Sequence, residues 1–177
     1  LEKFMHGKPI AEQEIGKLLL LETVSYAESS MCRRRSLLHY FGETYPETNC
    51  GNCDNCCNPK PKIEAKKDMQ LALEALLDIG DKFKIDHLVA VLMGKVTAMV
   101  KSYGHNKLEL FGVGAERDVH FWNAVIRQGL IMGYIDKNIE NYGLISVNER
   151  GKEFIDHPHP ITITLDHDYD SEDENMA

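Results

Sequence analysis

The sequence lacks several features that define common classes of protein. It has no apolar run near the ~20 residues that a membrane-spanning helix needs; the longest is Leu88–Met93. Its five cysteines are an odd number and no secretory signal peptide precedes them, which argues against a secreted disulfide scaffold. The phosphate-binding motif GxxxxGK[ST] is absent too. We therefore expect a cytoplasmic protein without a membrane partner, whose cysteines are free or bound to a metal.

Basic residues are missing from one region of the chain. Residues 158–177 contain six acidic residues and no Lys or Arg. The 177-residue chain has a net charge of −8, but without these six residues the remainder has 20 basic and 22 acidic side chains. A nearly neutral body can still present local basic faces, so the net charge does not exclude a nucleic-acid partner. The composition of 158–177 predicts an acidic linker or disordered tail.

Four cysteines follow the pattern C-x17-C-x2-C-x2-C, at Cys32, Cys50, Cys53 and Cys56. Cysteines two residues apart can turn their sulfurs toward one ion, and Gly-Asn between the first pair tolerates the required backbone turn. Structural zinc sites are nearly always closed and tetrahedral, so a fourth ligand must come from outside the cluster. The pattern therefore predicts a structural Zn²⁺ site with these four cysteines as ligands.

Other uses of these cysteines stay open. Cys57 is adjacent to Cys56, and neighbouring side chains do not usually both reach one tetrahedral ion, so we expect Cys57 to be a bystander or a thiol that lies beside the ligands without binding the ion. Cys57 could instead replace Cys56 in the quartet. Four cysteines can also hold an iron–sulfur cluster. A thiol redox enzyme using Cys53 and Cys56 is a further alternative, although no βαβ pattern surrounds this CxxC.

The first third of the chain predicts two helices before the cysteine cluster, over residues 11–31 and 36–41. Pro59 and Pro61 then interrupt any helix and mark a boundary. We therefore expect residues 1–60 to form a helical hairpin clamped by zinc.

Residues 61–157 predict three further main helices followed by a β-hairpin. Asp68 is the expected N-cap of the first of these helices. The expected elements are helices near 68–79, 86–93 and 117–132, a short helix around 96–103, and strands 134–137 and 144–147 joined by a turn at 140–143. This order is typical of a winged helix, which usually binds DNA. The predicted fold class is mainly α with a small β-hairpin: a zinc-clamped helical hairpin (1–60), a winged-helix domain (61–157) and an acidic tail (158–177).

Two blocks of sequence resemble the C-terminal region of bacterial RecQ DNA helicases. CRRRSLLHYFGE at 32–43 and CGNCDNC at 50–56 resemble the RecQ zinc-binding subdomain. SYGHNKLELFGVG at 102–114 and FWNAVIRQGLIMGY at 121–134 resemble the winged-helix half of the same region. The resemblance covers about residues 1–157, in the order that the family has.

The resemblance implies an ATP-dependent helicase that moves 3′ to 5′ on DNA and acts in repair and recombination. ATP and Mg²⁺ would be used by a motor with two RecA-like lobes and a P-loop. Because this sequence has no P-loop motif, the resemblance implies a motor upstream of Leu1 and a fragment that is inactive alone. The expected partner is duplex, forked or otherwise branched DNA.

The DNA-contact candidates bracket the loop and short helix after the second winged-helix helix. Cations and hydroxyls there would hold phosphates without reading sequence. These candidates are Lys95, Thr97, Lys101, Ser102, His105 and Lys107. Tyr142, at the expected wing tip, is a candidate for stacking on or separating the end of a duplex, as an aromatic does in some RecQ relatives; an ordinary turn tyrosine is the alternative.

Several aromatic and basic residues have a structural interpretation. Phe121 and Trp122 lie inside an amphipathic helix, which favours core packing over base stacking. The run Arg33–Arg35 is expected to pair with nearby carboxylates rather than with DNA. The winged helix could also serve as a protein-interaction module, with protein partners in place of DNA.

Overall fold

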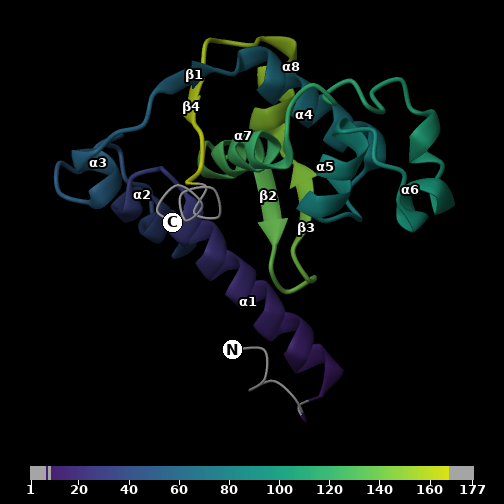
Figure 1. The fold of residues 1–177 in the computed structure, drawn as a ribbon, viewed down its shortest axis with the longest axis horizontal. Helices are drawn as coiled ribbons and strands as arrows, with labels where there is room; N and C mark the ends of the chain where they lie inside the picture. Colours follow the sequence, from purple (N-terminus) through teal and green to yellow (C-terminus); the bar gives the residue numbers. More distant parts are fainter. Residues whose placement is uncertain (1–6, 8, 168–177) are drawn as a thin grey trace, which may run out of the picture. The chain divides into compact units, whose positions relative to one another are not determined.

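The computed structural model describes residue 7 and residues 9–167 (Figure 1). The chain divides into two compact units. The cysteine unit comprises 1–59, 139–143 and 166–177, and the winged-helix unit comprises 60–138 and 144–165. Residues 168–177, which hold most of the acidic side chains of the expected tail, lie outside the described residues. Among the helices of the described part, none is long and apolar enough to span a membrane.

The cysteine unit contains three helices: α1 (Ile10–Glu28), α2 (Arg33–Tyr40) and α3 (Asp54–Cys57). The first two correspond to the helices expected at 11–31 and 36–41, whereas the single turn of α3 was not anticipated. Neither α1 nor α2 has a buried residue. The buried side chains in the described part of this unit are those of Ser29, Ser30, Cys32 and Asn55. The described residues of this unit therefore form no apolar core of their own.

The winged-helix unit has three main helices, a short insertion and a hairpin. The main helices are α4 (Lys66–Ile79), α5 (Ile85–Leu92) and α7 (Val119–Ile131). Helix α6 (Ala98–Ser102) and the 3₁₀ helix η2 (His105–Lys107) lie between α5 and α7. Strands β2 (Ile135–Asn138) and β3 (Leu144–Val147) then form the antiparallel hairpin, and helix α8 (Glu149–Asp156) follows. The predicted fold class, mainly helical with a small hairpin in a winged-helix order, is confirmed.

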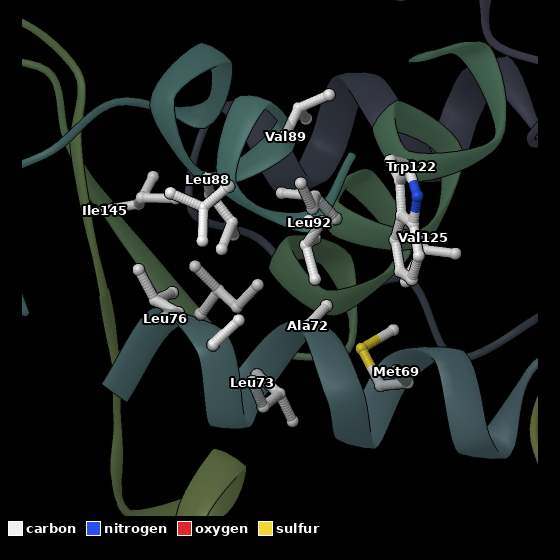
Figure 2. Close-up of a cluster of buried hydrophobic side chains, with 14 of the residues drawn as sticks. Met69, Ala72, Leu73, Leu76, Leu88, Val89, Leu92, Trp122, Val125 and Ile145 are labelled. Atoms are coloured by element: carbon white, nitrogen blue, oxygen red, sulfur yellow. The ribbon is translucent and has the colours of Figure 1, made fainter. Parts of the chain in front are cut away.

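The apolar core of the winged-helix unit lies between α4, α5 and α7 (Figure 2). Apolar residues recur at three- and four-residue spacing along α4, which places Met69, Leu73 and Leu76 on one buried face. Trp122 packs opposite from α7 and is fully buried, as is Leu88 from α5. The expectation that the aromatic pair on α7 packs in the core is therefore confirmed.

The backbone at Gly114, in the FGVG segment before α7, lies close to the buried ring of Trp122. The indole Nε1 of Trp122 donates a hydrogen bond to the carbonyl of Gly114 over 3.0 Å. A Cβ on Gly114 would lie only 2.3 Å from the Trp122 ring. The absence of a side chain at Gly114 thus allows the backbone to accept from the buried indole.

A second strand pair connects the two ends of the winged-helix unit. Strand β1 (Lys62–Glu64) pairs antiparallel with β4 (Thr162–Thr164), with Ile63 opposite Ile163 (Figure 1). The expectation of a linker or disordered tail from residue 158 therefore does not hold for this segment. The physical reason is the alternation of Ile161-Thr162-Ile163-Thr164, whose isoleucines are buried in the core.

The expected N-cap of α4 is wrong. Asp68 lies inside the first turn of α4, and the N-cap position is Ala65. The Asp68 carboxylate instead lies 3.9 Å from Nε of Arg117. Asp118 and Asn148 do cap helices: their side chains accept from the amides of Phe121 and Gly151.

Candidate metal centre and nucleic-acid interface

Four thiols converge in the cysteine unit. The sulfurs of Cys32, Cys50, Cys53 and Cys56 all lie within 4.8 Å of one another. A tetrahedral zinc site with bonds of about 2.3 Å has sulfur–sulfur separations of about 3.8 Å, and Sγ of Cys50 lies 3.9 Å from Sγ of Cys56. A disulfide would need about 2.05 Å, and all five cysteines are free. The donor set therefore fits one tetrahedral ion that prefers sulfur.

Local structure explains how the chain brings these sulfurs together. Cys32 precedes α2 and Cys53 precedes α3, so each projects from a helix N-terminus, while Cys56 lies within α3. Gly51 has a φ of 69°, which allows the tight turn after Cys50. The backbone amide of Cys50 donates to Sγ of Cys56 over 3.3 Å. Cys57 is exposed and lies outside the quartet, as expected for a bystander.

Without a bound metal, the thiols of Cys50 and Cys56 have very different pKa values. Backbone hydrogen bonds from Asn52 and Cys53 lower the pKa of Cys50 to about 6. Burial raises the pKa of Cys56 to about 12. Four thiolates packed together without a cation repel one another, so a divalent ion is the group that would let all four ionise.

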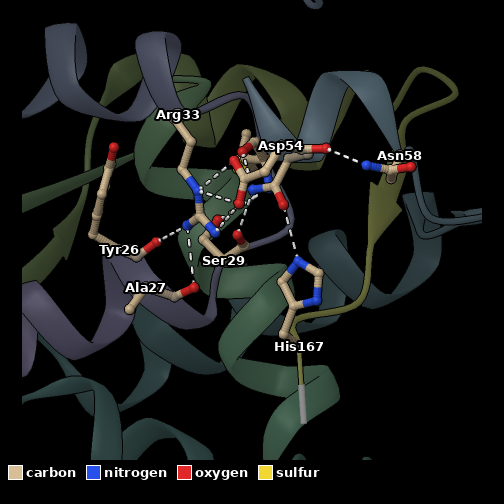
Figure 3. A network of polar contacts seen from close by, with 9 residues as sticks. Tyr26, Ala27, Ser29, Arg33, Asp54, Asn58 and His167 are labelled. Carbon is tan, nitrogen blue, oxygen red and sulfur yellow. Dashed lines mark hydrogen bonds and ion pairs between the residues drawn. The ribbon is translucent and has the colours of Figure 1, made fainter. Parts of the chain in front are cut away.

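Arg33 links the helices around the centre (Figure 3). Its guanidinium pairs with both carboxylate oxygens of Asp54, with Nη2 2.9 Å from Oδ2 and Nε 3.1 Å from Oδ1. Nη1 donates to the carbonyls of Tyr26 and Ala27 at the end of α1. The hydrogen bonds from Arg33 lower the pKa of Asp54 to about 2. One side chain thus connects α1, α2 and the cysteine-bearing α3.

Asn55 is a second connection, and sequence reasoning missed it. Its buried amide donates to the carbonyls of Ser29 and Met31, each over 2.7 Å. Its Oδ1 lies 2.9 Å from Nε2 of His167, which Figure 3 labels. The backbone amide of His167 donates to the carbonyl of Glu28 over 2.7 Å. Asn55 stands between Cys53 and Cys56, so these bonds fix the backbone that carries two of the four thiols.

Within the arginine run, Arg33 has the carboxylate contact that was expected, whereas Arg34 contacts a tyrosine. Arg33 pairs with Asp54, one of the carboxylates considered from the sequence. The guanidinium of Arg34 lies over the ring of Tyr45, with 5.9 Å to its centroid. The hydrogen bond with Tyr45 raises the pKa of Arg34.

The candidate DNA-contact cations lie on the insertion between α5 and α7. Residues 94–108 contain three lysines and no acidic residue, in a chain whose net charge is −8. Lys95, Lys101 and Lys107 are exposed, as is Ser102. Within the described part of the chain, none of the three lysines takes part in an ion pair. Their charges are therefore available to an anionic partner.

Two candidates on this insertion have structural roles. His105 is only 8% exposed, and its Nδ1 lies 2.8 Å from Nε2 of the buried His87. Its ring is therefore not presented to a DNA backbone, which corrects the expectation that it contacts phosphate. The hydroxyl oxygen of Thr97 accepts from the amide of Val100 and caps α6, but its hydrogen can still be donated outward.

Tyr142 lies in the turn between β2 and β3. Its φ of 57° makes it the non-glycine residue with a left-handed backbone in the described part of the chain. Such a conformation costs a bulky residue about 1–2 kcal/mol. The side chain is 44% exposed, so burial does little to offset that cost. Tyr142 is therefore an exposed aromatic side chain on a strained turn.

A closed four-thiol centre followed in sequence by a winged-helix unit defines a class of metal-stabilised winged-helix proteins. Comparison with known families agrees: the RQC domain model matches residues 59–172, and the RecQ zinc-binding model matches residues 1–57. The chain belongs to the RecQ family, whose RQC and zinc-binding regions it contains.

Individual relatives give the same assignment. The chain is 31% identical to the ATP-dependent DNA helicase RecQ of Pasteurella multocida over 88% of its own length and 25% of the relative's. It is 34% identical to the RecQ of Haemophilus influenzae over 78% of its own length and 22% of the relative's. A more distant match, the ATP-dependent DNA helicase Q-like 4B of Arabidopsis thaliana, is 31% identical over 72% of this chain. The chain thus spans a quarter or less of these relatives.

Proposed function

We propose that the chain is the DNA-binding and structural part of a RecQ-type ATP-dependent 3′–5′ DNA helicase. The support is the family match over both units together with relatives that are ATP-dependent DNA helicases. These 177 residues contain no phosphate-binding loop. ATP and Mg²⁺ would therefore be bound by a motor in another part of the protein, and this chain alone would not hydrolyse ATP.

Zn²⁺ is the ion that we propose for the four-thiol centre. The four sulfurs lie within 4.8 Å of one another, and four cysteines would fill all the positions of a tetrahedral zinc site. No position is left for water, so the ion would supply folding free energy rather than catalysis. Arg33 and Asn55 would orient the ligands through the backbone that carries them.

The observation that carries the DNA-binding proposal is the acid-free run of exposed lysines on the insertion. Lys95, Lys101 and Lys107 would contact phosphates, with Ser102 and the Thr97 hydroxyl as additional donors. Phosphate contacts do not depend on base sequence, which suits an enzyme that moves along DNA. Tyr142 would stack on the end of the duplex, where the two strands separate.

Fluorescence anisotropy with a labelled forked duplex tests this proposal. We expect binding whose affinity falls steeply between about 50 and 200 mM salt, because each phosphate contact releases a counterion. Lys101→Glu and Lys107→Glu should each weaken binding and lower the salt slope. Lys17→Glu, at an exposed lysine of α1, is the charge-matched control. Binding that does not respond to salt, or no binding at low salt, would refute the phosphate contacts.

A protein-interaction module is the second candidate. Exposed apolar side chains on the winged-helix unit favour it, including Leu77 and Val113, which are 45% and 51% exposed. The same charge reversals separate the two functions. If they leave DNA binding intact and abolish only a protein contact, the module binds protein.

A further inference from the structure

Tyr103 combines high exposure with a fixed ring. It follows α6 directly, and its side chain is 59% exposed. The ring nevertheless packs edge-on against the buried Phe83, with 4.9 Å between centroids and 90° between planes. It also lies 5.8 Å from the ring of His105. Most exposed tyrosines change rotamer freely, whereas this one is supported from beneath by two buried rings.

The rings beneath Tyr103 are held by further contacts. Phe83 stacks on His87 with 4.1 Å between ring centroids and 18° between planes. His87 in turn is hydrogen bonded to His105 over 2.8 Å. The backbone carbonyl of Phe83 accepts from the amide of Ile145 on β3 over 3.0 Å. The cluster of Phe83, His87 and His105 therefore anchors Tyr103 to the core of the unit.

The surroundings of Tyr103 are cationic and apolar. Lys101 and Lys107 flank it in sequence, and residues 94–108 carry no acidic side chain. Met99, four residues earlier, lies on the same face of α6 and is 50% exposed. Lysines interleaved with a fixed, exposed aromatic ring form the arrangement by which proteins hold the backbone and stack on the bases or sugars of one nucleic-acid strand.

We propose that Tyr103 is a further DNA contact, with its ring lying against a sugar or base of the strand whose phosphates are held by Lys101 and Lys107. The inference rests on the proposed function, because it needs the phosphate contacts that bring the strand to this face. Tyr103 adds contact area that is independent of charge. The preformed cluster beneath it lowers the entropy lost on binding, since the ring is ordered beforehand.

Anisotropy titrations of the full chain on a forked duplex at several salt concentrations test the proposal. Tyr103→Ala should weaken binding by about 10-fold, the range found for one aromatic stacking contact. Its salt slope should equal that of the unchanged chain, because no phosphate contact is lost. Lys101→Ala should instead reduce the slope by about 1. Tyr103→Phe, which keeps the ring, should bind like the unchanged chain.

The control is Tyr40→Ala in the cysteine unit. Tyr40 is 47% exposed and also packs edge-on against a phenylalanine, but Phe41 is itself 69% exposed, so Tyr40 matches Tyr103 in exposure and lacks the buried rings beneath it. Trp122 fluorescence would verify the folding of the Tyr103 variants, and circular dichroism would verify that of Tyr40→Ala, because Trp122 lies in the other unit. Tyr103→Leu keeps apolar cover over Phe83, and it should show the same loss of binding as the alanine variant.

The outcomes separate the two proposals. Salt-dependent binding of the unchanged chain with no effect of Tyr103→Ala and Tyr103→Leu would overturn the role of Tyr103 and leave the lysine contacts standing. That result would favour a protein partner for the apolar side chains of α6. Absence of binding by the unchanged chain would overturn the phosphate contacts and, with them, this inference.

Discussion

Helix α4 of the winged-helix unit buries six of its 14 residues, whereas the longer α1 of the cysteine unit buries none of its 19. The winged-helix unit is held by apolar contacts among α4, α5 and α7. The cysteine unit has instead a four-thiol centre and the polar contacts of Arg33 and Asn55. The difference indicates that one chain can combine a unit that folds by hydrophobic burial with one whose folding we expect to depend on a bound ion.

Removal of zinc should show the difference between the two units most clearly, because it should unfold one of them and leave the other folded. A strong chelator, or Cys53→Ser, should unfold the cysteine unit, because a structural zinc supplies about 10–16 kcal/mol. Trp122, the single tryptophan, is buried in the other unit and should keep its emission. Circular dichroism would report the loss of α1 and α2. Cys57→Ser is the control and should retain one zinc per chain. A metal-free protein with full helicity would contradict the comparison.

Leu73→Ala should destabilise the winged-helix unit and leave the metal centre unchanged. Leu73 is fully buried in α4, and truncation of a buried leucine costs about 2–5 kcal/mol of unfolding free energy. Urea unfolding followed by Trp122 fluorescence would measure the loss, while zinc content should not change. Leu77→Ala, on the same helix but 45% exposed, should change stability by less than about 0.5 kcal/mol. Zinc loss in the Leu73 variant would show that the units are not independent.

Arg33→Ala should weaken the metal centre without abolishing it. Residues that orient the segments carrying the ligands typically contribute about 10–100-fold in metal affinity. Competition with a chromogenic chelator would measure the change. Arg35→Ala, from the same run of arginines, is the matched control and should leave the affinity unchanged. Equal effects of both substitutions would point to general charge rather than to the contacts with Asp54 and the end of α1.

Acid should destabilise the winged-helix unit through its buried histidine pair. Burial, with the neighbouring His105, lowers the pKa of His87, and burial lowers that of His105. Because the unfolded rings bind protons more readily than the folded ones, stability is fully present above the unfolded value of about 6.5 and is lost as the pH falls toward the folded values. Urea unfolding monitored by Trp122 across this range would show the loss. The double variant His87→Gln/His105→Gln should reduce the dependence of the unfolding free energy on pH. An unchanged dependence would show that the histidine pair is not its cause.

Tyr142→Asn should have the smallest effect. Asparagine tolerates the left-handed backbone of this turn, so the variant should gain about 0.5–1 kcal/mol of stability. Binding to a forked duplex should weaken at the same time if the ring contacts DNA. A stability gain without any change in binding would identify Tyr142 as an ordinary turn residue. Thermal unfolding and anisotropy on the same preparations measure both effects.

Features local in sequence were predictable. The C-x2-C-x2-C spacing indicated the metal ligands, and apolar periodicity indicated α4 and α7. Contacts between distant residues were not predictable in this way: Asn55 meets His167 across 112 positions. His105 contacts His87, which lies 18 residues earlier, so its burial could not be predicted from the loop sequence alone. The alternation at 161–164 was a strand signal, but the acidic residues after it favoured a tail.

The bonds of His167 bear on how this protein can be dissected. A fragment ending at Pro59 would contain all four cysteines yet lack His167, and the buried Oδ1 of Asn55 would lose its protein partner. Expression trials that stop at the last cysteine would therefore yield an incomplete metal-binding piece. Supplying the residues around 167, by a short engineered connection in place of 60–165, is the more promising way to obtain that piece in isolation.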